Sequence, residues 1–270
     1  MIRLALRVRR AQAELVLAEL LELAPAGVEE VDRGEVVEYA LYGAPGELPE
    51  LPALEAVAGG ALVEVATSQV ADDWDRRWRD FHRPALVGDR LYVRPTWEPP
   101  LARPEVIDVA IDPGRAFGTG AHPTTRLCLE LLLELAPSGS LVDLGCGSGV
   151  LAIAAAKLGW SPVVAVDHEA AAVEATAANA AVNGVAVEAR RLDLRREPPP
   201  AAATVMANLT APLLRELAVR LAYPPPRRLV VSGLLAIEIA SVAPAFAPQG
   251  LAERARRTEA EWAALVLNRT

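Results

Sequence analysis

The sequence predicts an α/β fold whose larger part is a doubly wound, mostly parallel sheet of seven strands. From about residue 123, strand and helix patterns alternate regularly, which is typical of a parallel sheet. The last two strand patterns, at 250–257 and 261–268, have no helix between them and predict a closing antiparallel hairpin. Residues 1–67 follow another order, β-α-β-β-α-β, which predicts a small ferredoxin-like α+β domain.

The small N-terminal domain, residues 1–67, is predicted from short alternating and periodic segments. Apolar residues alternate with polar or small ones from Ile2 to Val8, which is the period of a half-buried strand. The pair Arg33-Gly34 lies between two further strand patterns and indicates a hairpin. The expected elements are a strand at 2–8, a helix at 12–23, strands at 28–31 and 36–41, a helix at 51–58 and a strand at 62–66.

Residues 68–105 are expected to connect this domain to the main one. A polar helix is predicted at 72–81, where Trp74 and Trp78 are four residues apart and therefore lie on one face. A strand follows at 90–93, and the prolines between 95 and 104 exclude a helix there.

The main domain, residues 106–270, begins with a strand at 106–111 and then alternates. Helices are expected at 124–135, 149–159, 169–182, 211–221 and 235–246, and strands at 141–144, 162–166, 185–189, 203–207 and 228–232.

Charge and composition limit the classes of function. A net charge of −8 and a pI of about 5.1 argue against tight nonspecific nucleic-acid binding, which usually needs a basic face. No stretch reaches the 18 uninterrupted apolar residues of a membrane span, and residues 1–7 do not resemble a signal peptide. Two cysteines, Cys128 and Cys146, are too few for a disulfide framework and favour a reducing cytoplasm. With three scattered histidines they offer no metal-ligand spacing.

The most informative segment is the glycine-rich loop D-L-G-C-G-S-G-V-L at 143–151. It follows an apolar strand and opens a helix, so the free N–H groups of the first helical turn point at any ligand there. Gly145, Gly147 and Gly149 allow a sharp turn and a close approach of backbone to ligand. Asp167 ends the next predicted strand, where a carboxylate can accept hydrogen bonds from both ribose hydroxyls. Together these features predict a nucleoside-bearing cofactor.

The details of the loop favour S-adenosyl-L-methionine over a dinucleotide. A dinucleotide site has the spacing G-x-G-x-x-G, whereas this loop reads G-x-G-x-G with Val150 in the sixth position. Asp143 would repel a pyrophosphate but attract an ammonium group, directly or through water. S-adenosylmethionine has a ribose and an ammonium group and no phosphate. We therefore expect Asp143, Gly145, Gly147 and Asp167 to bind this cofactor.

A second glycine-rich loop, D-P-G-R-A-F-G-T-G-A-H-P-T-T at 112–125, precedes the first helix of the main domain. Such a long loop without an apolar run usually serves a ligand. Phe117, Gly118, Thr119 and Thr125 are expected to contact the cofactor from the side opposite the first loop. The alternative for Thr124 and Thr125 is a purely structural place at a helix N-terminus.

Asn208 lies at the tip of the predicted strand 203–207, in the stretch A-N-L-T. Strand tips on this edge of a doubly wound sheet face the ligand crevice. A side-chain amide there can accept a hydrogen bond from a substrate N–H group. Asn208 is therefore the candidate catalytic residue and also a candidate cofactor contact. The alternative is a cap for the next helix, where Pro212 stands early.

Together these motifs resemble the ribosomal protein L11 methyltransferase (PrmA) family, over essentially the whole chain. The resemblance implies a Rossmann-like methyltransferase sheet and S-adenosyl-L-methionine as the cofactor. It also implies that the N-terminal domain recognises ribosomal protein L11. It rests on the loops at 112–125 and 143–149, Asp167, N-x-x-x-N-G at 179–184, A-N-L at 207–209, S-G-L-L at 232–235, and the Trp-bearing segments 73–81 and 94–98.

The residue roles and the reaction follow from the same resemblance. It implies that Thr125, Gly145, Asp167 and Asn208 contact the cofactor or the reaction centre. The implied reaction is methylation of lysine side chains or the N-terminal amine of ribosomal protein L11.

The expected chemistry is transfer of an activated methyl group to a neutral amine, which depends on positioning more than on acid–base catalysis. A desolvated pocket lowers the pKa of the amine, and Asn208 could hold it in line. No residue of the motifs is an obvious base, although His122 is possible. Methyltransferases that modify glutamine are expected to have N-P-P-Y at this position, where the prolines fix backbone acceptors for the amide. The stretch Asn208-Leu209-Thr210 lacks these prolines, which disfavours an amide as the methyl acceptor. Methylation of another protein or a small amine, and a noncatalytic cofactor-binding module, are the alternatives.

Overall fold

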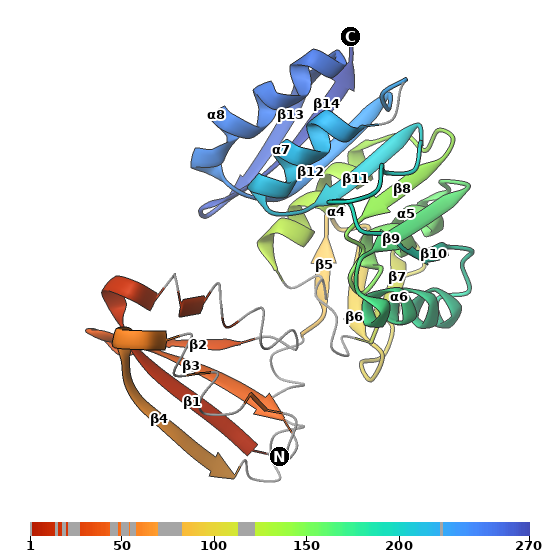
Figure 1. The fold of residues 1–270 in the computed structure, drawn as a ribbon. Helices are drawn as coiled ribbons and strands as arrows, with labels where there is room; N and C mark the ends of the chain where they lie inside the picture. Colours follow the sequence, from red (N-terminus) through yellow and green to blue (C-terminus); the bar gives the residue numbers. More distant parts are fainter. Residues whose placement is uncertain are drawn as a thin grey trace. The chain divides into compact units, whose positions relative to one another are not determined.

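The computed structural model describes residues 2–13, 16–17, 20, 28–43, 48–49, 54, 58–69, 83–112, 122–221 and 224–270. The chain divides into two compact units, Met1–Phe81 and His82–Thr270, which are described separately here (Figure 1).

The first unit contains an antiparallel sheet of four strands in the order β2-β3-β1-β4. Its strands are β1 (Ile2–Arg9), β2 (Glu29–Asp32), β3 (Val36–Gly43) and β4 (Leu62–Gln69). The predicted strands are confirmed, and so is the hairpin, whose turn includes Gly34 at φ +82°. This strand order is the one a ferredoxin-like β-α-β-β-α-β chain produces.

Helical residues lie in both segments where the first unit was expected to have helices. Ala13, Val16, Leu17 and Leu20 are helical in the first segment, and Leu54 and Ala58 in the second. Most of them are buried and form one core with alternate residues of β1 and β3. Gln12, where the first helix was predicted to begin, lies in a 3-10 turn, and the remaining residues of the two predicted helices lie outside the described residues. Two 3-10 turns flank these segments, η1 (Arg10–Gln12) and η2 (Gly59–Ala61).

A buried carboxylate lies on the sheet of the first unit. Glu38 on β3 is fully buried and forms ion pairs with Arg33 at 2.9 Å and with Arg3 and Arg7 at 2.7 Å. Hydrogen bonds from Arg33 and Arg3 outweigh burial and lower the pKa of Glu38 to about 2. Both carboxylate oxygens of Glu38 are paired with arginines, so we interpret this cluster as structural.

The second unit begins with a small sheet in the order β5-β6-β7, with bounds Ala85–Val87, Leu91–Pro95 and Ile107–Ile111. The strands predicted at 90–93 and 106–111 are confirmed, and β5 was not predicted. Residues 83–105 therefore belong to the second unit, because β5 pairs with β6 and β6 with β7. The predicted helix at 72–81, with Trp74 and Trp78, lies outside the described residues.

The large sheet has seven strands in the order β10-β9-β8-β11-β12-β14-β13 (Figure 1). The first five run parallel, and β14 pairs antiparallel with both β12 and β13, so the predicted closing hairpin is confirmed. The strands are β8 (Leu141–Leu144), β9 (Val163–Asp167), β10 (Glu188–Arg191), β11 (Thr204–Asn208), β12 (Arg228–Leu235), β13 (Leu251–Glu259) and β14 (Trp262–Arg269).

Two apolar layers cover this sheet. One lies between the sheet and the helices α4 (Pro123–Glu134) and α5 (Val150–Leu158), with α6 (Ala170–Val182) at its edge. The other contains α7 (Ala211–Arg220), α8 (Ile239–Val242) and the 3-10 segment η4 (Ala243–Gln249). The four longer helices of this region match the predicted ones to within about two residues at each end.

Two predictions in this region were inexact, for local reasons. The helix expected at 235–246 is broken into η3 (Ala236–Glu238), α8 and η4, and η4 contains two prolines that lack an N–H donor. The strand expected at 185–189 begins at Glu188 instead. Gly184, at φ +64°, ends α6, and the N–H of Val185 still donates to the carbonyl of Ala180 at 3.2 Å.

Candidate functional site

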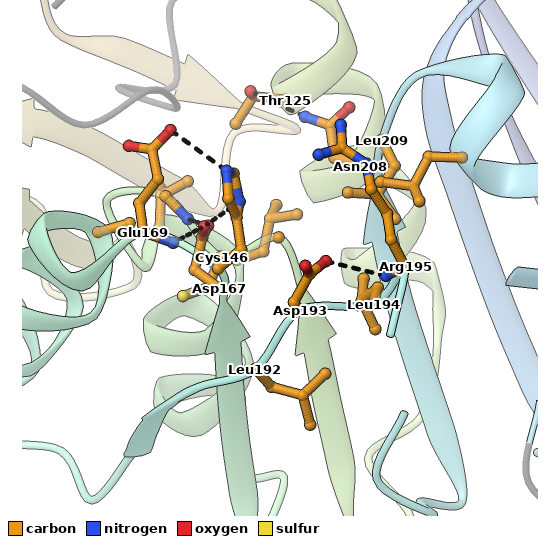
Figure 2. A pocket seen from close by; sticks show the side chains of 17 residues that line it. Thr125, Cys146, Asp167, Glu169, Leu192, Asp193, Leu194, Arg195, Asn208 and Leu209 are labelled. Carbon is orange, nitrogen blue, oxygen red and sulfur yellow. Dashed lines mark hydrogen bonds and ion pairs between the residues drawn. The ribbon is translucent and has the colours of Figure 1, made fainter. Parts of the chain in front are cut away.

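A cavity of about 220 Å³ lies at the carboxyl ends of β8, β9 and β11. The glycine loop after β8, the turn after β9, the segment after β10 and the tip of β11 all line it. Figure 2 shows these side chains converging from separate strands. The structure thus brings together Thr125, Gly145, Gly147, Asp167 and Asn208. This edge is where doubly wound sheets bind ligands.

The glycine loop turns sharply between β8 and α5. Gly145, Gly147 and Gly149 have φ values of +74°, +52° and +83°, which favour glycine. The N–H groups of Gly145 and Cys146 donate to the carbonyl of Val166 at 2.8 and 3.0 Å, which fixes the loop to β9. A Cβ at Gly145 would collide with the side chain of Leu209. The loop therefore needs glycine for its backbone conformation and for its close contact with the segment after β11.

Asp167 lies at the end of β9 and lines the cavity, as expected. Its Oδ2 accepts a hydrogen bond from the N–H of Gly147 at 3.0 Å, and its Oδ1 one from Glu169 at 3.1 Å. His168 Nδ1 is 3.2 Å from the same Oδ1. These contacts hold the carboxylate against the glycine loop, where a ribose would place its hydroxyls.

Asp143 lies in β8, behind the loop, and not among the residues that line the cavity. It is buried, and its Oδ2 accepts a hydrogen bond from the N–H of Ala152 in α5 at 3.2 Å. Its Oδ1 has no hydrogen-bond partner in the described part of the chain. Burial, with a smaller contribution from the charge of Asp167, raises the pKa of Asp143 to about 7. Contact between Asp143 and the cofactor stays a prediction, because the structure shows the carboxylate bonded to α5.

Asn208 and Thr125 both line the cavity, and their side chains are in contact. The side-chain N–H of Asn208 donates to Thr125 Oγ1 at 3.4 Å, at the start of α4 (Figure 2). Asn208 Oδ1 accepts no hydrogen bond from any described residue. Asn208 does not cap α7, whose N-cap is Thr210. The amide is therefore oriented by Thr125 with its acceptor atom available to a ligand.

His122 precedes Thr125 and is the N-cap of α4. Its Nδ1 accepts a hydrogen bond from the N–H of Thr124 at 3.3 Å and lies 2.8 Å from the Thr124 hydroxyl. Its ring meets the Trp262 ring edge to face, with centroids 5.0 Å apart. Burial, and then the charge of Arg126, lower the pKa of His122. His122 does not line the cavity, so its described contacts fit a capping role better than that of a general base.

The segment Asn208-Leu209 is held in place by Gly233, the glycine of the S-G-L-L motif. Gly233 has φ +80°, and a Cβ there would lie 2.5 Å from the carbonyl oxygen of Leu209 and 2.9 Å from its nitrogen. The N–H of Leu209 donates to the carbonyl of Ser232 at 3.0 Å. The glycine thus lets β12 pass directly behind the residue that follows Asn208.

Asn179 in α6 and Asn183 at its C-terminal cap support the site from outside the cavity, a role that the sequence did not assign. Asn179 accepts from the N–H of Asp112 at 2.8 Å and donates to the carbonyls of Asp112 at 3.2 Å and Ser148 at 2.9 Å. Asn183 bonds both backbone groups of Ala110, at 3.0 and 2.6 Å. They join the end of β7, where the second glycine-rich loop begins, to the first glycine loop. The N-x-x-x-N spacing was the available signal, because it places both amides on one helical face.

Other expected or possible features are placed as follows. Phe117, Gly118 and Thr119 lie outside the described residues. Cys146 lines the cavity, and burial raises its pKa to about 12, so the thiol is protonated.

Within the described ranges, no three His, Cys, Asp or Glu side chains form a group that could hold a metal ion. None of the helices in those ranges is both long and apolar enough to span a membrane.

The donor set of the cavity fits S-adenosylmethionine. Asp167 presents a carboxylate at one wall for ribose hydroxyls, and the glycine loop lets the backbone approach the ligand. Acidic side chains also line the cavity at Glu169 and Asp193, which suits a ligand with cationic groups better than one with a pyrophosphate. Arg195, from the same segment as Asp193, is a lining residue that the motifs did not indicate.

Comparison with known proteins agrees with this geometry. The model of the family described as ribosomal protein L11 methyltransferase (PrmA) matches residues 11–270. A relative from Geobacter metallireducens, named ribosomal protein L11 methyltransferase, is 40% identical over 197 residues, which are 72% of this chain and 66% of the relative. One of the same name from Yersinia pseudotuberculosis serotype IB is 42% identical over 195 residues, 70% of this chain and 66% of the relative.

A solved structure gives the same result for the fold. The ribosomal protein L11 methylase of Lactobacillus delbrueckii subsp. bulgaricus superposes with a TM-score of 0.63 at 26% identity, covering 70% of this chain and all of that one. The chain spans just under two thirds of the length of the first curated relatives. The family model matches residues 11–270 of this chain, and curated relatives are about 40% identical. The chain therefore belongs to the ribosomal protein L11 methyltransferase (PrmA) family.

Proposed function

We propose that this protein is an S-adenosyl-L-methionine-dependent N-methyltransferase that methylates lysine side-chain or N-terminal amines of ribosomal protein L11. The observation that carries the proposal is the side chain of Asn208, an amide with a free acceptor atom in the same cavity as Asp167 and the glycine loop. Membership of the family, whose named relatives are ribosomal protein L11 methyltransferases, supports the choice of substrate.

The cofactor is assigned to the cavity by its lining groups. Asp167 would hold the ribose, and the glycine loop would contact the sugar and the amino-acid part through its backbone. Thr125 and Asn208 would lie at the reacting end, and Phe117, Gly118 and Thr119 of the second loop would be further cofactor contacts. Asp143 would act on the ammonium group through the loop or through water. When bound, this cofactor supplies a methyl group that is already activated for transfer.

The protein's contribution to the reaction is to hold the acceptor. Asn208 Oδ1 accepts a hydrogen bond from the amine N–H and directs the nitrogen lone pair at the methyl carbon. Thr125 keeps the amide in that orientation through its hydroxyl. The apolar lining at Leu209 and Leu213 excludes water and disfavours the ammonium form of the acceptor. An amine acceptor suits this site because one carbonyl oxygen suffices to orient an N–H group.

The first unit is assigned to recognition of the substrate protein, because the described residues that line the cavity all belong to the second unit. Ribosomal protein L11, free or on the ribosome, would be the partner, without sequence-specific contact to nucleic acid. A cytoplasmic location follows from that substrate. A truncated chain beginning near residue 68 should bind the cofactor and fail to methylate ribosomal protein L11. Full transfer by the truncated chain would refute this division of roles.

The direct experiment is methyl transfer from labelled S-adenosylmethionine to dissociated ribosomal proteins. We expect the label in the band of ribosomal protein L11, and peptide mass spectrometry should place it on lysine side chains or the N-terminus. Label in another protein would support the alternative protein substrate, and label only in added small amines would support a small-molecule enzyme. Cofactor binding without any transfer would identify a noncatalytic module. The Asn208→Ala variant is the control for transfer that does not depend on this site.

A further inference from the structure

An unpaired positive charge lines the proposed reaction site. Arg195 follows β10 and lines the same cavity as Asn208. Figure 2 shows its side chain running from that segment toward the Asn208 amide. Its backbone N–H donates to Asp193 Oδ1 at 3.0 Å, but its guanidinium has no ion-pair partner among the residues that the structure describes.

The neighbouring arginines differ from Arg195 in this respect. Arg191 donates to the carbonyl of His168 at 2.8 Å, and Arg196 lies 3.4 Å from Asp193 Oδ2. Both are therefore accounted for by local structure. Of the three, only Arg195 lines the cavity, and its guanidinium forms no ion pair with a described residue.

The acidic groups that face the cavity have other partners. Both oxygens of Asp167 accept backbone N–H groups, and Asp193 accepts one from Arg195 and pairs with Arg196. Glu169 lies 3.7 Å from His168. Among the lining residues of the glycine loop only Cys146 is titratable, and Asp143 lies behind them. Helices α4 and α7 and strand β11 contribute no charged lining residue. Arg195 is thus a lining cation that forms no ion pair with a described residue, in a cavity that Asp167, Glu169 and Asp193 also line.

A fixed positive charge near an amine lowers the pKa of that amine, because it repels the ammonium form. The amine must lose its proton before transfer, and none of the residues in the sequence motifs is an evident base to take it. We propose that Arg195 faces the acceptor amine and offsets the charge of the lining carboxylates there, so that the amine more readily takes the neutral, reactive form. This inference rests on the proposed amine acceptor and extends it.

The reaction then needs no protein base. The ammonium group of the substrate gives its proton to water as it enters the cavity. The nitrogen lone pair forms a bond to the methyl carbon, while the electron pair of the carbon–sulfur bond stays on sulfur. The methylated product is again an ammonium ion, which the charge of Arg195 repels toward solvent, and a second proton loss would allow a second transfer.

The test is the pH dependence of single-turnover methyl transfer to ribosomal protein L11 by the full chain. For Arg195→Gln we expect the pH midpoint of the rate to rise by about one unit, with the plateau at high pH within about twofold of the original. Arg195→Lys should keep the original midpoint because it keeps the charge. Arg254→Gln is the control: it removes another exposed arginine, on β13, at the edge of the sheet away from β8 and β9.

Cofactor affinity, measured by calorimetry on the same variants, separates the proposal from its rivals. We expect it to change less than about twofold. A loss of tenfold or more with an unchanged pH midpoint would mean that Arg195 binds the cofactor carboxylate, which overturns the proposal. Unchanged affinity and an unchanged midpoint would make Arg195 a surface residue and overturn it too. If the unaltered chain methylates no protein amine at all, it is the proposed function that fails.

Discussion

Two asparagines in the second unit have opposite surroundings. Asn179, where α6 meets β7, is buried and uses both atoms of its amide in three hydrogen bonds to backbone groups. Asn208, at the tip of β11, makes one long hydrogen bond to Thr125, and its oxygen has no described partner. The same side chain therefore stabilises the fold in one place and is available to a ligand in the other.

The two carboxylates that are buried in the described part of the chain repeat this contrast. Glu38 in the first unit is surrounded by three arginines, and its pKa is lowered to about 2. Asp143 behind the glycine loop has one backbone partner and one unpaired oxygen, and its pKa is raised to about 7. The ion pairs of Glu38 stabilise its charged form in the folded protein. The unpaired oxygen of the buried Asp143 lowers stability instead, and this residue lies beside the candidate site.

The largest effect is expected at Asn208. Replacing it with alanine should lower the methyl-transfer rate by about 10²–10³-fold, or about 3–4 kcal/mol, because the acceptor loses its orienting group. The free energy of unfolding should change by less than about 1 kcal/mol, since only one long hydrogen bond is lost. Single-turnover rates and urea unfolding measure the two quantities. A large loss of stability with normal turnover would reverse the comparison.

The next effect is expected at Asn179. Its replacement with alanine removes three buried hydrogen bonds and should lower the free energy of unfolding by about 3 kcal/mol. Val182→Ala, on the same helix but 61% exposed, is the control and should cost less than about 0.5 kcal/mol. Urea unfolding checks both. Equal effects of the two variants would show that the clamp between α6 and β7 is not stabilising.

A smaller effect is expected at Asp167, which lies between the two extremes because its oxygens are paired yet line the cavity. Asp167→Ala should weaken S-adenosylmethionine binding by about 2 kcal/mol, or about 30-fold, in calorimetry. Glu174→Ala removes an equal charge from an exposed position of α6 and should leave affinity unchanged. NADH should show no comparable binding. Unchanged affinity in Asp167→Ala would remove this residue from the site.

The smallest effect concerns the pH dependence of stability. The folded protein keeps a proton on Asp143 that the unfolded chain releases above its ordinary pKa of 3.8. Stability should therefore fall as pH rises from about 4 to about 7, and Asp143→Asn should remove about 1 kcal/mol or more of that fall.

Glu38 should behave in the opposite way. Its lowered pKa adds stability above pH 4.5, which is lost as pH falls from there to about 2, and Glu38→Gln should remove this acid dependence. Unfolding curves between pH 3 and pH 8 test both residues. If the two variants change the pH dependence in the same direction, the contrast between the carboxylates is wrong.

Much of the fold followed from local patterns in the sequence. Periodic apolar residues predicted the seven-stranded sheet, its closing hairpin and the strands of the first unit, because each pattern is produced within one element. β5 was missed because it has only three residues, and the prolines of η4 broke a helix that the apolar spacing had predicted. Short strands and the ends of elements depend on tertiary contacts that no local pattern records.

The glycine loop and the position of Asp167 at a strand end could be predicted from the sequence, because neighbouring residues specify a tight turn and the end of a strand. The same motifs also indicated the family. Only the tertiary structure decided which polar groups are paired. The Asn179 and Asn183 clamp, the fit of Gly233 behind Leu209, the unpaired oxygen of Asp143 and the free guanidinium of Arg195 all depend on residues far apart in the chain. Hydrogen bonding and burial are properties of the packed neighbourhood, and that is where structural and functional side chains become distinguishable.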